Sequence, residues 1–337
     1  MDNKVLIKYK YKMKYIILTG HRKSGTTLLH RLFDNHPELN IYPTDISLLY
    51  AYYPYWTNKN LSASELKDRF SIVIQKSMSV FAEKIILKNG NKFDPNIFLK
   101  IIWKNYKPTD LVKPDIIIDA VSNSYCEYLE LDKSLPFVFK ETSQIINLKQ
   151  ISSNNPDVKM LQIIRDPRDN YAAIKVGVSN YYKKFGEDEM ESLASMLNRT
   201  KFDLELARRE IENKSGKFYT VHFEDLTTSS ETTLKKITND LKIKWHNNLK
   251  FPTLLGEEFT GNNHSGDKFK GISSNNIGKW KERISKNEAC IIEGWLADIM
   301  TYWGYQLEYS HDDHVTALSD FYAWYNCKYF FRDSFTA

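Results

Sequence analysis

The feature that most constrains the fold is an apolar run followed directly by a glycine-bearing loop and a helical pattern. The run YIILTG (15–20) is apolar, as a buried strand is, and TLLHRLF (27–33) spaces its apolar residues as a helix does. A strand, a tight loop and a helix N-terminus in this order form an anion site, because unpaired backbone N–H groups and the helix dipole point at one spot. The sequence therefore predicts an α/β fold with an anion bound near its first loop.

The loop GHRKSGTT differs from the nucleoside-triphosphate motif G-x-x-x-x-G-K-[ST] in the place of its lysine. Gly20 and Gly25 have the required separation. Thr26 and Thr27 follow where that motif has its lysine, whereas Lys23 lies inside the loop. The pattern argues against a P-loop nucleotide kinase and indicates a different anionic ligand.

Composition narrows the class of protein. The chain has 337 residues, 42% of them hydrophobic and 26% charged, which is enough for a sizeable core. The net charge of +5 is mild, and it suits a pocket for a small polyanion better than a nucleic-acid surface. We expect a cytoplasmic protein for three reasons: the three cysteines are dispersed and form no CxxC pair, no apolar run has the length of a membrane span, and the loop motif comes early in the sequence.

Short apolar runs alternate with helical stretches along the chain, which is typical of a central parallel sheet flanked by helices. The expected strands are YIILTG (15–20), ELNIYP (38–43), DIIIDA (115–120), FVFKET (137–142), KMLQIIRD (159–166) and KFYTVHFED (217–225). Residues 57–114 are rich in lysine and asparagine and lack strand signals. We expect this segment to be a helical insertion or lid and not a separate domain.

Two later stretches carry residues suited to an anionic group. In LQIIRDPRDNYAAIKVG (161–177), Arg165 ends an apolar strand beside a helix start. There it either binds a phosphate or pairs with Asp166 or Asp169 on a surface turn. In FKGISSNNIGKWKERIS, glycines and Lys270 either approach a ligand or form a loop before an amphipathic helix.

Together the three stretches resemble the sulfotransferases that use 3′-phosphoadenosine 5′-phosphosulfate (PAPS). GHRKSGTT is similar to their 5′-phosphosulfate loop, RDPRD to their 3′-phosphate motif, and FKGISSNNIGKW to the segment that closes over the nucleotide. VHFEDL and WGYQL also resemble family landmarks. The resemblance runs from Tyr15 to Leu307 and implies one domain over residues 1–310 with a P-loop nucleotide-kinase-like sulfotransferase fold. It leaves the aromatic-rich tail 311–337 unexplained.

The resemblance also implies which residues bind PAPS. Lys23 would bind the phosphosulfate and act as the electrophile, and Arg165 would hold the 3′-phosphate. The implied nucleotide-binding residues are Arg22, Lys23, Ser24, Gly25, Thr26, Thr27, Arg165, Lys270 and Gly271. Transfer of a sulfuryl group through a loose, in-line transition state depends on positioning and charge, so no metal ion is expected.

One position departs from the family pattern. The family usually has a serine two helical turns after the arginine, as a second ligand of the 3′-phosphate. Counting from Arg165 reaches Ala173, which has no side-chain donor. A neighbour such as Lys175, Ser265 or Lys270 would have to supply the missing charge-assisted hydrogen bond.

The acceptor hydroxyl needs a general base near the sulfur atom. The cytosolic branch of the family uses a histidine in a K-T-H triplet, but the matching FKETS has none. Other branches use a carboxylate after the second strand, where this chain has Asp45. We therefore expect Asp45 to be the base, with Lys140 as a second cation and Glu141 as the reserve base. The alternative role of Asp45 is to cap a helix ISLLYAYY.

The acceptor and some segments stay open at this point. The resemblance implies a hydroxyl acceptor such as a glycan, a glycolipid or a small metabolite, and a non-catalytic nucleotide-binding protein is the alternative. AYYPYW (51–56) forms either a wall against the acceptor or part of the core. HDDH (311–314) is more typical of a helix cap than of a metal site. FYAWYNCKYFF (321–331) is a packing helix, a dimer contact or a membrane-surface helix.

Overall fold

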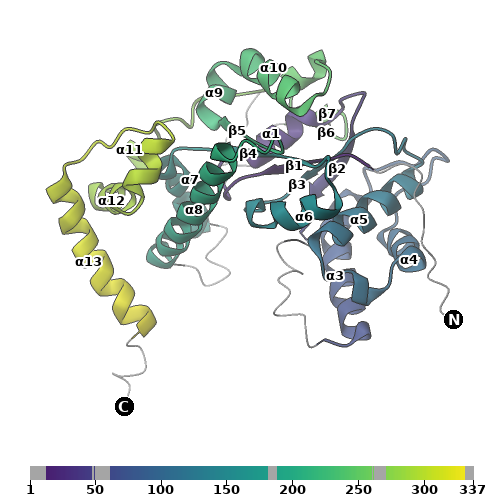
Figure 1. Ribbon diagram of the computed structural model, residues 1–337, viewed down its shortest axis with the longest axis horizontal. Coiled ribbons are helices and arrows are strands. Elements are labelled where there is room, and N and C mark those ends of the chain that lie inside the picture. The colour runs from purple at the N-terminus through teal and green to yellow at the C-terminus, as the bar shows by residue number, and fades with distance from the viewer. Residues whose placement is uncertain are drawn as a thin grey trace.

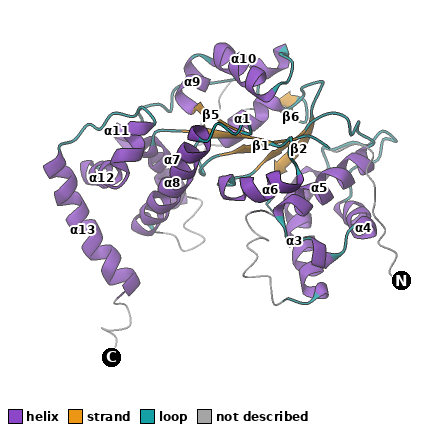
Figure 2. Cartoon of the chain, viewed as in Figure 1, coloured by secondary structure: helices purple, strands orange, loops and turns teal. Residues whose placement is uncertain are grey.

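Five parallel strands form the centre of the molecule, with helices on both faces of the sheet (Figures 1 and 2). The computed structural model describes residues 13–47, 49, 61–180, 188–259, 261 and 271–330. The strand order is β2-β3-β1-β4-β5. The strands are β1 (Tyr15–Thr19), β2 (Asn40–Asp45), β3 (Phe137–Lys140), β4 (Lys159–Ile164) and β5 (Phe218–His222). This is the parallel α/β architecture that the alternation of strand-like and helical runs predicts.

The two faces of the sheet bury alternate residues of each strand. On β1, Ile16 and Leu18 face one hydrophobic core, and Tyr15 and Ile17 face the other, because side chains alternate along a strand. The first core is covered by α1 (Thr26–Phe33), α9 (Phe223–Thr228) and α10 (Ser230–Leu241). The second is covered by α5 (Pro114–Leu129), α6 (Leu148–Asn154), α7 (Pro167–Asn180), α8 (Glu189–Glu212) and α12 (Lys286–Tyr302).

Residues 115–120 are helical, so the strand expected at DIIIDA is wrong. They lie in α5, where Ile117, Val121 and Tyr125 are buried. The spacing of four residues between these buried side chains is the helical period, and it extends past the isoleucine run that suggested a strand. A short apolar run does not distinguish a buried helix from a buried strand, and here packing decides. The other five expected strands are confirmed, with shifted ends.

The described part of residues 57–114 is helical and packs on the sheet. It contains α3 (Ala63–Ala82), α4 (Pro95–Asn105) and the short η2 (Pro108–Asp110). Phe70 of α3 and Phe98 of α4 are fully buried in the same core as Tyr42 of β2. Movement of this segment as a lid stays a prediction. The aromatic run 51–56 lies outside the described residues, as do residues 48 and 50–53 of the helix expected after Asp45.

The C-terminal helix packs along α12 at one edge of the molecule (Figure 1). In α13 (His311–Phe330), Leu318 lies so close to Gly294 of α12 that a Cβ on this glycine would be 2.8 Å from it. The rings of Trp295 and Phe321 meet edge to face at 5.6 Å. The described part of the aromatic tail is thus a helix packed on the domain. None of the helices in the described ranges is long and apolar enough to cross a membrane.

The remaining elements are short and lie between the helices. They are η3 (Ile145–Asn147), η5 (Asn247–Lys250), the antiparallel pair β6 (Thr253–Leu254) and β7 (Glu257–Glu258), and α11 (Trp280–Arg283). Two of them, the β6–β7 hairpin and α11, come close enough to the first loop to form part of the site described below.

Candidate functional site

A cavity of about 330 Å³ lies at the carboxyl ends of the central strands, the edge at which open parallel sheets bind their ligands. The loop between β1 and α1, the ends of β2, β3 and β4, the β6–β7 hairpin and the segment around α11 all contribute to it. The lining residues are Arg22, Lys23, Gly25, Thr26, Thr27, Leu28, Asp45, Lys140, Thr142, Arg165, Ala173, Val176, Phe223, Pro252, Phe259, Gly261, Gly271, Ser273, Asn276 and Arg283.

The loop between β1 and α1 has a backbone that requires glycine at one position. Gly25 has a φ of +106°, and a Cβ built on it would lie 2.5 Å from the ring of Phe223. Lys23 has a positive φ of 67°. The helix then begins at Thr26 on the cavity wall, where the unpaired N–H groups of a helix N-terminus favour an anion.

Polar side chains behind the loop hold its shape. The hydroxyl of Ser24 donates to the carbonyl of His21 at 2.7 Å, so this serine, expected to bind the ligand, does not line the cavity. His21 Nδ1 lies 2.8 Å from Asn170 Oδ1, and Asn170 Nδ2 donates to the carbonyl of Arg22 at 2.6 Å. Burial lowers the pKa of His21 to about 3, so its ring is neutral. Sequence reasoning missed His21 and Asn170, although both lie within the quoted motifs.

Lys23 is a half-buried cation on the cavity wall. Its pKa is lowered to about 8, because burial disfavours the charged form and because Arg22 and Lys140 repel it. An anion bound between these cations would offset their mutual repulsion and raise the pKa of Lys23. This part of the cavity wall therefore favours a negatively charged group.

Asp45 and Lys140 end the neighbouring strands β2 and β3 and face each other. The distance from Lys140 Nζ to Asp45 Oδ1 is 2.8 Å, and the same ammonium donates to Thr27 Oγ1 at 3.3 Å. The lysine side chain is 7% exposed and the aspartate side chain 38%. A carboxylate is thus held at the edge of the cavity by a buried cation, and solvent reaches it.

Glu141 has a different place from Asp45. It is 2% exposed and does not line the cavity. Its Oε2 accepts the N–H of Ser47 at 2.5 Å, at a residue with a positive φ of 56°. Burial and the nearby charge of Asp45 raise the pKa of Glu141 well above its usual value. The hydrogen bond from Ser47 to Glu141 stabilises the turn that follows β2.

Arg165 joins two segments of the cavity wall. Its Nη1 donates to the carbonyl of Lys23 at 2.9 Å, and its Nη2 to the carbonyl of Asn276 at 2.7 Å. The guanidinium lies over the ring of Phe223, 4.5 Å from its centroid. The alternative considered from sequence, an ion pair on a surface turn, does not form: the arginine is buried, and both following aspartates bind other groups.

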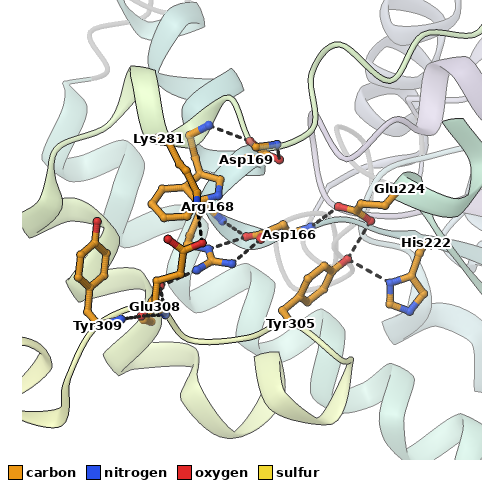
Figure 3. A network of polar contacts seen from close by, with 12 residues as sticks. Asp166, Arg168, Asp169, His222, Glu224, Lys281, Tyr305, Glu308 and Tyr309 are labelled. Atoms are coloured by element: carbon orange, nitrogen blue, oxygen red, sulfur yellow. Dashed lines mark hydrogen bonds and ion pairs between the residues drawn. The ribbon is translucent and has the colours of Figure 1, made fainter. Parts of the chain in front are cut away.

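Asp166 belongs to a network that ties α7 to the C-terminal part of the chain (Figure 3). It accepts two hydrogen bonds from the guanidinium of Arg168, at 3.0 and 2.7 Å, and this guanidinium also donates to the buried Glu293 at 2.6 Å. The N–H of Asp166 donates to Glu224, as does the hydroxyl of Tyr305. Glu224 lies in VHFEDL and Tyr305 in WGYQL, so this network connects RDPRD with both of these stretches.

Asp169 fixes the segment ahead of α11. Its two carboxylate oxygens accept the backbone N–H groups of Gly278 at 2.7 Å and Trp280 at 2.9 Å. Together with the bond from Arg165 to Asn276, these contacts attach the segment to the N-terminus of α7. The start of α7 therefore holds both the first loop and the segment ahead of α11, and both line the cavity.

Comparison with known proteins gives the family. The model of the group described as "Sulfotransferase family" matches residues 16–247. The chain belongs to the sulfotransferase family. A comparison with curated protein sequences finds no match. The family accounts for the five-stranded parallel sheet and for the position of the cavity at its edge.

Three of the solved structures to which the chain is similar are sulfotransferases. The sulfotransferase domain from the curacin biosynthetic pathway is 17% identical, with a TM-score of 0.54, covering 88% of this chain and 99% of that one. Sulfotransferase STF9 from Mycobacterium avium is 9% identical, with a TM-score of 0.49 over 88% of this chain and 79% of that one. Mouse sulfotransferase SULT7A1, complexed with PAP, is 13% identical, with a TM-score of 0.47 over 92% of this chain and 89% of that one. The first of these likenesses supports the fold of the sulfotransferase.

The structure brings most of the expected nucleotide-binding residues of this sulfotransferase to one cavity. Those that line it are Arg22, Lys23, Gly25, Thr26, Thr27, Arg165 and Gly271. Lys270 and Ser265 lie outside the described residues, and Ala173 lines the cavity as expected of its position. Lys175 instead binds Glu288 at 2.8 Å and does not line the cavity. It is therefore not placed to replace the missing serine.

Other lining residues of the sulfotransferase were not found from sequence. Pro252 and Phe259 flank the β6–β7 hairpin, which is attached to the end of α1. There Asp34 accepts the hydroxyl of Thr253 at 2.8 Å and the N–H of Gly256 at 2.9 Å. No motif marks this hairpin, because its contacts are set by tertiary packing. Arg283 was missed although it lies in the quoted glycine-rich stretch.

The HDDH stretch begins α13 and packs it. Ser310 Oγ accepts the backbone N–H of Asp313, and the carboxylate of Asp313 accepts the backbone N–H of Ser310, as in a capping box. His314 Nε2 lies 3.0 Å from Glu293. Among the described residues, no group of three or more histidines, cysteines or acids is arranged to hold a metal ion.

Proposed function

We propose that this sulfotransferase moves the sulfuryl group of PAPS to a hydroxyl acceptor and releases 3′,5′-ADP. The observation that carries the proposal is the common cavity of Lys23, Lys140 and Asp45 at the N-terminus of α1. Two cations and a carboxylate are the groups that a transfer from a phosphosulfate to a hydroxyl requires. The loop has no lysine after Gly25, which argues against the magnesium-dependent use of ATP.

In the proposed reaction the acceptor oxygen attacks sulfur as the bond from sulfur to the 5′-phosphate oxygen breaks. Negative charge grows on that leaving oxygen. The ammonium of Lys23 and the N–H groups at the start of α1 stabilise this charge most strongly in the transition state, which is the condition for accelerating the step. Lys140 adds a second positive charge beside the transferring group.

The acceptor loses its hydroxyl proton during the attack, and Asp45 receives it in this proposal. Support comes from its place at the cavity edge and from the contact with Lys140, which holds the carboxylate. Glu141 is buried, outside the lining, and already accepts a backbone N–H, so it is the weaker candidate. A proton acceptor must reach the hydroxyl, and exposure favours Asp45.

The remaining parts of the proposal concern the nucleotide, the acceptor and the compartment. Arg165 and Gly271 also line the cavity, and we assign them to the nucleotide. The acceptor class is a glycan, a glycolipid or a small metabolite with a hydroxyl group. The three cysteines are free thiols, and one of them, Cys327, is exposed, which supports a reducing compartment such as the cytoplasm.

The test is transfer of label from [35S]PAPS to a panel of glycan, glycolipid and small-molecule hydroxyl acceptors, in the presence of EDTA. We expect a labelled acceptor and 3′,5′-ADP in equal amounts. Lys23→Ala protein, purified identically, is the control for contaminating activity and should be inactive. Binding of 3′,5′-ADP without any transfer across the panel favours a binding protein. Binding of ATP with magnesium in preference to 3′,5′-ADP would overturn the proposal.

A further inference from the structure

Two cations on the cavity wall have no hydrogen-bond or ion-pair partner among the residues that the structure describes. Lys140 is bound to Asp45, and Arg165 to two backbone carbonyls. Within the described part of the chain, no hydrogen bond or ion pair engages the ammonium of Lys23 or the guanidinium of Arg283, and both line the cavity. Burial makes the charge of Lys23 unfavourable without a counter-charge. Arg283 is partly exposed and adds a second unpaired cation to the same cavity, so the two together suit a ligand with two separate anionic groups.

The backbone that carries Arg283 is firmly held. Arg283 is the last residue of α11, and Trp280 is the first. The backbone N–H of Trp280 donates to Asp169, and the Cζ atom of Arg168 lies over the indole ring, 4.4 Å from its centroid. The same indole packs against Ala172 of α7. The chain thus fixes where the side chain of Arg283 begins and leaves its charged end unpaired. This is the arrangement expected of a residue that meets a ligand.

The surroundings of Arg283 in the cavity leave room for that ligand. Ala173 lines the same cavity and provides neither bulk nor a side-chain donor. Gly271 also lines this cavity, and a Cβ on this residue would meet no atom within 4 Å. Arg165 gives two of its N–H groups to backbone carbonyls, which holds the wall in place, and its Nε is buried without a hydrogen-bond partner among the described residues. The guanidinium of Arg283, which meets no partner among those residues, is free to bind an anion here.

We propose that Arg283 binds the second anionic group of the nucleotide and determines the preference for a nucleotide with two separated phosphates. This inference rests on the proposed use of PAPS, in which the second group is the 3′-phosphate. A guanidinium suits this task because its parallel N–H groups match two phosphate oxygens. Arg283 would then take the part that the serine missing at Ala173 leaves open.

The test is isothermal titration of the full chain with 3′,5′-ADP and with 5′-ADP, which has both phosphates on the 5′ position and no 3′-phosphate. Arg283→Gln should weaken binding of 3′,5′-ADP about 10- to 150-fold, the effect of losing a charge-assisted pair, and leave binding of 5′-ADP nearly unchanged. Arg283→Lys keeps the charge without the paired N–H groups and should fall between. Lys281→Gln is the matched control, since Lys281 is exposed, pairs with Glu308 and does not line the cavity.

The outcomes separate this inference from the proposed function. If the unchanged protein prefers 3′,5′-ADP and Arg283→Gln keeps that preference, the role of Arg283 is wrong and the proposed function stands. Equal weakening for both nucleotides would also overturn it, because the arginine would then act on the wall and not on the second phosphate. If the unchanged protein has no preference for 3′,5′-ADP, both proposals fall. Restoration of the preference in Arg283→Gln by the added change Ala173→Ser would support the shared subsite.

Discussion

At the scale of single residues, Lys23 is a cation whose charge changes near neutral pH. Its pKa in the free protein is about 8, lowered by burial and by the charges of Arg22 and Lys140. A phosphate binds the protonated form and raises this pKa. Affinity for 3′,5′-ADP should therefore be full below pH 8 and fall as pH rises through 8, by up to about tenfold per unit.

Titrations of 3′,5′-ADP between pH 7 and pH 9.5 measure this dependence above the range in which the phosphates themselves titrate. Lys23→Arg is the control, because arginine stays charged in this range and should flatten the profile. An equal fall in both proteins would mean that another group is responsible.

Asp45 and Glu141 are adjacent carboxyl groups with different predicted tasks. Asp45→Asn should lower single-turnover transfer by two to four orders of magnitude, the usual contribution of a positioned base, while 3′,5′-ADP still binds. Glu141→Gln should keep most of its activity, because an amide oxygen also accepts the N–H of Ser47. Both rates are measured at saturating PAPS, with melting temperatures recorded. Loss of transfer in Glu141→Gln alone would move the base to Glu141.

At the scale of elements, the start of α7 holds the wall ahead of α11 through Asp169. Asp169→Ala leaves the N–H groups of Gly278 and Trp280 without acceptors, which lowers their protection against hydrogen exchange by about 1–3 kcal/mol each. Because the freed segment carries Arg283 and contacts Arg165, 3′,5′-ADP should also bind more weakly. Asp188→Ala is the control: this carboxylate accepts the N–H of Glu191, at the start of α8. Unchanged exchange at both amides in Asp169→Ala would disprove the attachment.

The elements also show how far the sequence predicts this fold. The first strand with its loop and the other four strands of the sheet could be predicted from local sequence, since each depends on a short apolar run and its neighbours. The strand predicted at DIIIDA is wrong because three isoleucines in a row are compatible with both the strand period and the helix period. Only the packing of residues beyond position 120 reveals the helix. Asp45 and Lys140 were placed near each other from sequence, and the register of β2 on β3 confirms their contact. Arg283 and the β6–β7 hairpin reach the cavity through tertiary packing, which no local pattern records.

At the scale of the whole molecule, one buried carboxylate joins the N-terminal motif of α7 to the last helix. Glu293 is fully buried, accepts Arg168 at 2.6 Å, and lies 3.0 Å from His314 of α13. It also accepts the N–H groups of Glu308 and Tyr309, which lead into that helix. The residues that surround the cavity and the aromatic C-terminal helix are therefore parts of one structure, although the family model ends before α12.

Glu293→Gln tests this connection. Removing the charge leaves Arg168 short of one buried partner, and breaking such a pair destabilises by about 3–5 kcal/mol. We expect a lower midpoint of urea unfolding and easier proteolytic release of α13. Glu282→Gln is the control, because Glu282 is exposed and forms its ion pair with Lys279, a contact of about 0–1 kcal/mol. Equal midpoints of urea unfolding for the two variants would show that α13 is held by its apolar contacts with α12 alone. Deletion of α13 would then leave the cavity and the nucleotide affinity of the protein unchanged.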